Sequence, residues 1–198
     1  MSEVPDIDHS VFVAPTAQIF GNVQIAAESS VWPNVVIRAE CQHVRVGRYT
    51  NLQDFVMIHV GYEHATEIGD FCSITHHATI HGCKIDDDCL VGINAVVMDG
   101  AMIGRGSIIA GSAVIREGTI FAPGSIIAGV PAKQIGERDS ARANRRNAWL
   151  YHWNAQAYKR GDHRSWTGPE YERWILELAE KLEADTDLAG IRSDASEE

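Results

Sequence analysis

The stretch VGINAVVMDGAMIGRGSIIAGSAVI, residues 91–115, carries an aliphatic residue at every sixth position. These positions are Val91, Val97, Ile103, Ile109 and Ile115. A small residue stands four positions after each of the first four, and glycine directly follows Val91 and Ile103. A period of six fits neither an amphipathic helix, whose period is about 3.6, nor an alternating strand, whose period is about 2. It predicts a β-solenoid in which each hexad supplies one short strand and one corner, with the aliphatic residue pointing inward.

The same period extends in both directions from this stretch, from Val13 to Ile127. We call the inward aliphatic residues anchors. They are Val13, Ile19, Ile25, Val31, Ile37, Val46, Leu52, Ile58, Ile68, Ile74, Ile80, Ile85, Val91, Val97, Ile103, Ile109, Ile115, Phe121 and Ile127. The pattern resembles the left-handed parallel β-helix of hexapeptide-repeat proteins, an all-β fold in which three hexads make one coil.

The phase of the repeat breaks at three places. Extra residues stand between Ile37 and Val46 and between Ile58 and Ile68, and the step from Ile80 to Ile85 is one residue short. Insertions in solenoids usually leave the stack as loops and often mark the binding face. We therefore expect two loops, and both lie next to histidines.

The repeat ends after residues 129–133, and the remaining chain has a helical pattern. We predict a β-helix domain over residues 8–135 and a C-terminal helical segment over residues 137–186 that packs on it. Its two helices are expected from Glu137 to Tyr158 and from Pro169 to Ala184. Residues 187–198 are polar and acidic, which predicts a disordered tail.

Composition excludes several functional classes. The formal net charge is −10 and the pI is about 5.3, which argues against nucleic acid as a partner. No apolar run reaches the roughly 20 residues that span a bilayer, and residues 1–6 show no signal-peptide pattern. We expect a cytoplasmic protein without a membrane partner. Of its four cysteines, Cys41, Cys72 and Cys89 occupy the small inward position, so we expect buried, reduced thiols.

Three histidines carry the strongest functional signal. His59 and His81 directly follow the anchors Ile58 and Ile80, as Arg38 follows Ile37. Residues at one phase of successive coils stack about 4.8 Å apart. The two imidazoles can therefore converge on one zinc ion.

His76 stands two positions after the anchor Ile74 and belongs to a different face. A neighbouring chain in a cyclic oligomer could supply it to the histidine pair. Asp54 and Gln53 follow the anchor Leu52, one coil earlier on the same face as His76. Three histidines with an open fourth position are typical of a catalytic zinc site, and Co2+ or Fe2+ suit the same ligands.

At these residues the chain resembles the γ-class carbonic anhydrase family. The resemblance covers roughly residues 8–135 and rests on residues 36–40, 51–54, 58–60 and 76–83. It implies a homotrimer with zinc at each interface, held by His59 and His81 of one chain and His76 of the next. The implied substrate is CO2, hydrated to bicarbonate.

The resemblance also implies roles for the surrounding polar residues. Arg38 and Glu40 would form an ion-pair network with Gln53 and Asp54 across the interface, and Gln53 would orient the hydroxide nucleophile. Asn154 or Tyr158 would correspond to polar helix residues that reach the site. The chain departs from the family in three places. Ala39-Glu40 stands where the family more often has Gly-Asp, and Thr75 stands where it more often has Gly. The chain also lacks a long acidic loop after His59.

Two alternatives remain open. Hexapeptide-repeat proteins include acyltransferases, so the chain could act as an acyltransferase or thioesterase on CoA esters with a histidine base. It could also be a metal-binding protein without turnover. Three histidines favour the metal reading over a CoA-ester enzyme, because a single base needs a single histidine.

Overall fold

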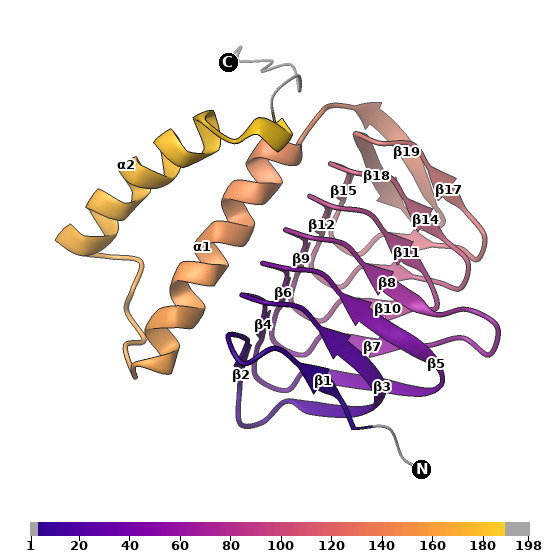
Figure 1. Ribbon diagram of the computed structural model, residues 1–198. Helices are drawn as coiled ribbons and strands as arrows, with labels where there is room; N and C mark the ends of the chain where they lie inside the picture. Colours follow the sequence, from indigo (N-terminus) through magenta and orange to yellow (C-terminus); the bar gives the residue numbers. More distant parts are fainter. Residues whose placement is uncertain (1–3, 189–198) are drawn as a thin grey trace.

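The computed structural model describes residues 4–188, which form a stack of β coils with two helices along one side (Figure 1). Each coil has three faces. Strands of the first face are β3 (Gln18–Ile25), β5 (Val36–Val46), β7 (Met57–His59), β10 (Thr79–His81), β13 (Val96–Val97) and β16 (Val114–Ile115). The second face holds β1 (Asp6–Ile7), the C-terminal halves of β3 and β5, β8 (Thr66–Ile68), β11 (Lys84–Ile85), β14 (Met102–Ile103) and β17 (Ile120–Phe121).

The third face is a separate 8-stranded sheet. Its strands are β2 (Phe12–Val13), β4 (Ser30–Val31), β6 (Asn51–Leu52), β9 (Ser73–Ile74), β12 (Leu90–Val91), β15 (Ile108–Ile109), β18 (Ser125–Gly129) and β19 (Ala132–Glu137). All pairings are parallel except that of β18 with β19. The predicted fold class, a left-handed parallel β-helix of hexapeptide repeats with C-terminal α-helices, is confirmed.

The repeat chemistry explains the stack. Anchors such as Ile58, Ile80 and Ile109 are fully buried and align in register from coil to coil. The glycine after an anchor is required by close approach of the next coil: a Cβ on Gly104 would lie 2.4 Å from the backbone nitrogen of Pro123. Position along the hexad therefore decides which way each side chain points.

Two local expectations were wrong. The insertion after Ile37 does not form a loop, because β5 runs through it from the first face to the second, paired with β3 and β8. This continuous strand also changes the side-chain phase, and Cys41 is exposed rather than buried. Cys72 and Cys89 are buried free thiols, as expected, and Cys83 is another. The insertion after Ile58 does form a loop, at residues 60–65.

Helix α1 (Ala141–Lys159) lies along the third face, against β2, β4, β6 and β9, and α2 (Pro169–Glu183) packs on α1 (Figure 1). The first helix begins four residues later than expected, because residues up to Glu137 form the strand β19. The 3-10 helix η1 (Thr186–Leu188) follows α2, and Leu188 is buried. The predicted disordered tail, residues 187–198, was therefore wrong for residues 187–188. Residues 189–198 lie outside the described part of the chain.

A buried ion pair fixes α1 to the β-helix. Asp88, fully buried, accepts hydrogen bonds from Nε and Nη2 of Arg145 at 2.7 and 2.9 Å. Asp185 accepts from Nη1 of the same arginine at 2.8 Å. Burial alone would lower the pKa of Arg145, but its bonds to both carboxylates raise it above the usual value.

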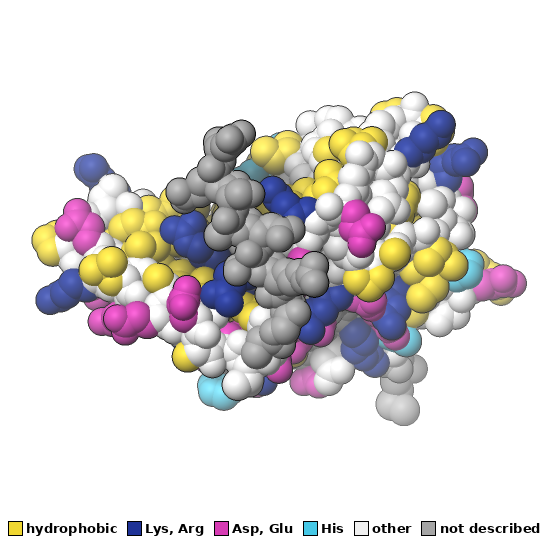
Figure 2. Space-filling model, turned by 90° about the horizontal axis from the view of Figure 1, so that it is seen from above, with side chains coloured by type: hydrophobic (Ala, Val, Ile, Leu, Met, Phe, Trp, Pro, Cys, Tyr) yellow, Lys and Arg dark blue, Asp and Glu magenta, His cyan; other side chains and the backbone are white. Residues whose placement is uncertain are grey.

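The face seen from above mixes Lys and Arg with Asp and Glu, and the helices project to one side of the β-helix (Figure 2). Among the described residues, neither helix is long and apolar enough to cross a lipid bilayer.

Candidate metal centre

His59 and His81 end the paired strands β7 and β10 and stand opposite each other in the ladder. Nδ1 of His59 lies 3.1 Å from Nε2 of His81. Their side chains are 23% and 25% exposed, so solvent reaches both rings only in part. The prediction that His59 and His81 stack on adjacent coils is confirmed.

A carboxylate binds the far nitrogen of each ring. Nε2 of His59 lies 2.9 Å from Oε2 of Glu40, and Nδ1 of His81 lies 2.5 Å from Oδ1 of Asp99. Glu40 also pairs with Arg38, two residues earlier on β5. Burial raises the pKa of Glu40, but the hydrogen bond from His59 and the charge of Arg38 outweigh it and hold that pKa below the usual value.

This arrangement leaves two nitrogen lone pairs facing each other. A neutral imidazole carries one N–H, and a carboxylate accepts it from the far nitrogen of each ring. Both near nitrogens are then acceptors, which repel at 3.1 Å unless a cation lies against them. Two nitrogens on one tetrahedral zinc stand about 3.3 Å apart, given Zn–N bonds of about 2.05 Å. The donor set therefore fits a divalent metal, in the carboxylate–histidine pattern usual for metal sites.

His76 lies at the opposite edge of the first face. It follows β9, and its Nδ1 lies 3.1 Å from Oδ2 of Asp54, which follows β6 one coil earlier. The His76 side chain is 38% exposed. Within residues 4–188, no group of three or more His, Cys, Asp or Glu side chains is arranged to hold a metal ion in a single chain. One chain thus offers two metal-facing nitrogens at one edge and a third histidine at the other.

Gln53, predicted to orient the nucleophile, is 2% exposed and adjoins Asp54. Its Nε2 donates to Oδ1 of Asn51 at 2.9 Å. The two helix residues proposed for the site have other partners in the chain. Asn154 accepts a hydrogen bond from Ser165, and Tyr158 packs against Phe12 and Trp32.

Two residues near the site were missed by the sequence analysis. Tyr151 of α1 lies near Asp54: burial and the negative charge of Asp54 raise the pKa of Tyr151 to about 12. Asp99 stands two positions after the anchor Val97, which pairs with Ile80. The phase rule that identified Asp54 could also have identified Asp99.

The outward side of the first face, between the two histidine-bearing edges, is mostly apolar, with Gln18 and Thr79 as the polar exceptions. Its half-buried outward residues are Val36, Met57, Thr79, Val96 and Val114. The second face carries polar residues at the equivalent positions of its first coils, namely Gln24, Arg45, Glu67 and Lys84. Met102 and Ile120 make the second face apolar at its last coils, but the first face is apolar along more coils and lies between the histidine edges, which favours it as a contact surface.

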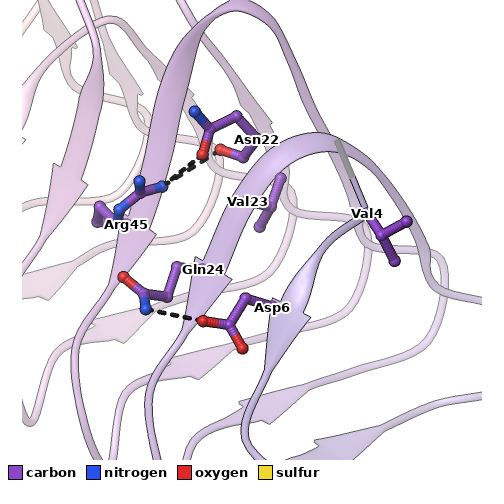
Figure 3. Close-up of a pocket in the computed structure, with 6 residues that line it drawn as sticks. All are labelled: Val4, Asp6, Asn22, Val23, Gln24 and Arg45. Carbon is purple, nitrogen blue, oxygen red and sulfur yellow. Dashed lines mark hydrogen bonds between the residues drawn. The ribbon is translucent and has the colours of Figure 1, made fainter. Parts of the chain in front are cut away.

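A hollow of about 450 Å³ lies at the N-terminal end of the β-helix (Figure 3). Its charged residues are already engaged: Arg45 donates to Oδ1 of Asn22 at 2.9 Å, and Asp6 accepts from Gln24 at 2.9 Å. The hollow contains no histidine and is a weaker candidate for chemistry than the histidine edges.

Comparison with known proteins bears on these residues. Residues 82–117 match the family described as "Bacterial transferase hexapeptide (six repeats)". The chain is 45% identical to the "Probable carbonic anhydrase" of Methanocaldococcus jannaschii, over 46% of this chain and 57% of that protein. It is 40% identical to the mitochondrial γ carbonic anhydrase 2 of Arabidopsis thaliana, over 52% of this chain and 42% of that protein. The matches thus span about half the length of these curated relatives.

A solved structure of a hexapeptide transferase family protein from Anaplasma phagocytophilum is also similar. It superposes with a TM-score of 0.74 at 31% sequence identity, over 78% of this chain and 92% of that chain.

Proposed function

The chain belongs to the γ-class carbonic anhydrase family of hexapeptide-repeat proteins, and from this premise we propose that it catalyses the reversible hydration of CO2 to bicarbonate. The proposed enzyme is a zinc-dependent homotrimer. Each site takes His59 and His81 from one chain and His76 from the next.

The observation that carries this proposal is the pair of facing nitrogens. Nδ1 of His59 and Nε2 of His81 lie 3.1 Å apart, each on a ring whose other nitrogen is bound to a carboxylate. The pairing keeps both rings in the tautomer that ligates a cation and holds them in place. A hydrolytic histidine base would not need a second imidazole at this distance.

The positions of the ligands support a threefold assembly. His59 and His81 lie at one edge of the first face and His76 at the other. If the first edge of one chain meets the second edge of the next, rotation about a threefold axis turns the first face towards that axis. The apolar outward side of that face, including Met57 and Val96, would then be buried in the assembly.

The chain's own residues have distinct tasks in this proposal. A divalent metal ion would supply Lewis-acid activation of water for attack on CO2. Glu40 and Asp99 hold His59 and His81 by their far nitrogens, and Asp54 holds His76. Arg38 restrains Glu40 through their ion pair, and Gln53 orients the attacking hydroxyl.

The test uses the purified full chain. We expect metal in the isolated protein and CO2 hydration above the buffer rate. His59→Ala and His81→Ala should each lose metal and activity, whereas His9→Ala, at a fully exposed position, should keep both. A metal-loaded trimer that hydrates CO2 no faster than buffer would exclude the enzymatic proposal and leave a metal-binding protein without turnover. Metal retained by His81→Ala would show the ligand set to be wrong.

The second candidate is acyl transfer or hydrolysis on a CoA ester. The similarity to a hexapeptide transferase family protein over 92% of that chain favours it. A histidine base works without a metal, so chelator treatment separates the two candidates. Thiol release from acetyl-CoA that survives chelation would favour this candidate. Activity lost on chelation and restored by Zn2+ would favour CO2 hydration.

A further inference from the structure

A chain of hydrogen bonds joins helix α1 to Gln53. Nδ2 of Asn147, on α1, donates to Oγ of Ser73 at 2.8 Å. Nδ2 of Asn51 donates to the same Oγ at 2.9 Å. Nε2 of Gln53 donates to Oδ1 of Asn51 at 2.9 Å. Four polar side chains from β6, β9, α1 and the corner after β6 therefore form one continuous path.

Burial makes the path rigid. Asn51, Ser73 and Gln53 are 1%, 0% and 2% exposed, and Asn147 is half-buried. Hydrogen bonds away from water are stronger, and a buried amide left without a partner is costly. Nδ2 of Asn51 also donates to the carbonyl oxygen of Cys72 at 3.3 Å, and because a carbonyl only accepts, Asn51 cannot exchange its oxygen and nitrogen ends without losing this bond.

The path also has a direction. Asn51 uses its nitrogen towards Ser73, so its oxygen faces Gln53, and Gln53 must present its nitrogen in return. This leaves Oε1, an acceptor, as the end of Gln53 that can meet a ligand. A hydroxyl that donates its proton to Oε1 keeps its lone pairs free to attack a carbon atom.

We propose that Asn147 is a positioning residue for Gln53, acting through Ser73 and Asn51 to fix the acceptor end of that amide at the edge of the first face that bears Asp54 and His76. The inference rests on the proposed CO2 hydration, in which Gln53 orients the hydroxyl. It adds that helix α1 holds the buried amides behind Gln53 in place. Arg145, half a helical turn before Asn147, holds the helix to Asp88, so docking of α1 and orientation of Gln53 are coupled.

The first experiment reads Gln53 directly in metal-free protein. The side-chain amide signal of Gln53 is recorded by 15N-resolved NMR and assigned by its loss in Gln53→Glu. In Asn147→Ala and Ser73→Ala, we expect this signal to shift and its protons to exchange faster with water. The matched control is Gln156→Ala, which removes an amide of α1 that bonds to Glu28 instead, and it should leave the signal unchanged.

The second experiment measures turnover in the metal-loaded trimer. Asn147→Ala should lower kcat roughly three- to tenfold with KM little changed, as expected for one buried hydrogen bond. The double variant with Ser73→Ala should be no slower than Ser73→Ala alone, because both changes interrupt one path. Losses that multiply would contradict the path.

The outcomes separate this inference from the function on which it rests. If the parent protein does not hydrate CO2, the proposed function is wrong. A Gln53 signal that shifts in Asn147→Ala would still support the positioning role of Asn147. A Gln53 signal unchanged in folded Asn147→Ala and Ser73→Ala overturns the inference. If circular dichroism shows Asn147→Ala unfolded, Ser73→Ala decides, since it removes only one oxygen atom.

Discussion

Asp99 accepts a hydrogen bond from Nδ1 of His81 at 2.5 Å, which leaves Nε2 of His81 directed at His59. The carboxylate comes from the turn after β13, one coil beyond the histidine it holds. The metal-facing pair therefore depends on a residue that is not itself a ligand in the proposed site.

Removal of this carboxylate should weaken metal binding. In Asp99→Ala we expect metal affinity to fall roughly 10- to 100-fold, since His81 loses the partner that sets its tautomer. Asp99→Asn should lose less, because its amide oxygen still accepts the bond. The measurement is competition with a chelator of known affinity, and Asp86→Ala, on an exposed carboxylate, is the control. Equal affinities for Asp99→Ala and this control would contradict the role.

The Asp88–Arg145 pair should dominate helix docking. Arg145→Ala leaves the carboxylate of Asp88 buried beside Arg105 alone, and removal of one partner from a buried pair costs about 3–5 kcal/mol. Urea unfolding followed by circular dichroism measures the loss. Lys84→Ala breaks an exposed pair with Asp86 and should change the free energy of unfolding by no more than about 1 kcal/mol. Similar losses in both variants would show that the buried pair has no special weight.

His152 should make stability depend on pH. Burial lowers its pKa, against the opposing effects of the carbonyl and carboxylate of Glu28. Between this lowered pKa and the usual value of about 6.5, the unfolded chain binds more protons than the folded chain. Its contribution to stability is therefore complete above about pH 6.5 and falls as the pH drops below it. Urea unfolding between about pH 7.5 and about pH 5.5 should show a smaller decline in His152→Gln than in the parent; equal declines would refute the assignment.

A charge on the first face should prevent assembly. Val96→Lys would place three ammonium groups around the proposed threefold axis, where their repulsion and desolvation oppose association. Light scattering should report monomers, and metal content should fall with them. Met102→Lys, on the second face, should remain trimeric. A metal-loaded trimer of Val96→Lys would place the interface elsewhere.

The β-helix could be predicted because one inward residue per hexad is enough to reveal a period. The pairing of His59 with His81 followed from the same phase, since stacked coils keep equivalent residues in register. Cys41 and the first insertion were mispredicted because β5 continues through the corner, where the hexad rule no longer applies.

The contribution of α1 could not be predicted from the sequence. Asn147 reaches Ser73, 74 residues earlier, and Tyr151 lies near Asp54. Which face of the helix meets which coil depends on how Arg145 docks into Asp88, a contact across 57 residues. Helical periodicity shows an apolar face but gives no register against a distant sheet, and Asn154 and Tyr158 rested on the family resemblance alone.

The central claim is that each metal site is shared between two chains, and mixed trimers test it most directly. Chains carrying His76→Ala and chains carrying His81→Ala are produced together with different affinity tags, and trimers containing both are purified. Each mixed trimer should bind about one metal ion, because only one interface combines an intact histidine pair with an intact His76. Trimers of either variant alone should bind none. Metal in either single-variant trimer, or none in the mixed trimer, would contradict a site shared in this way.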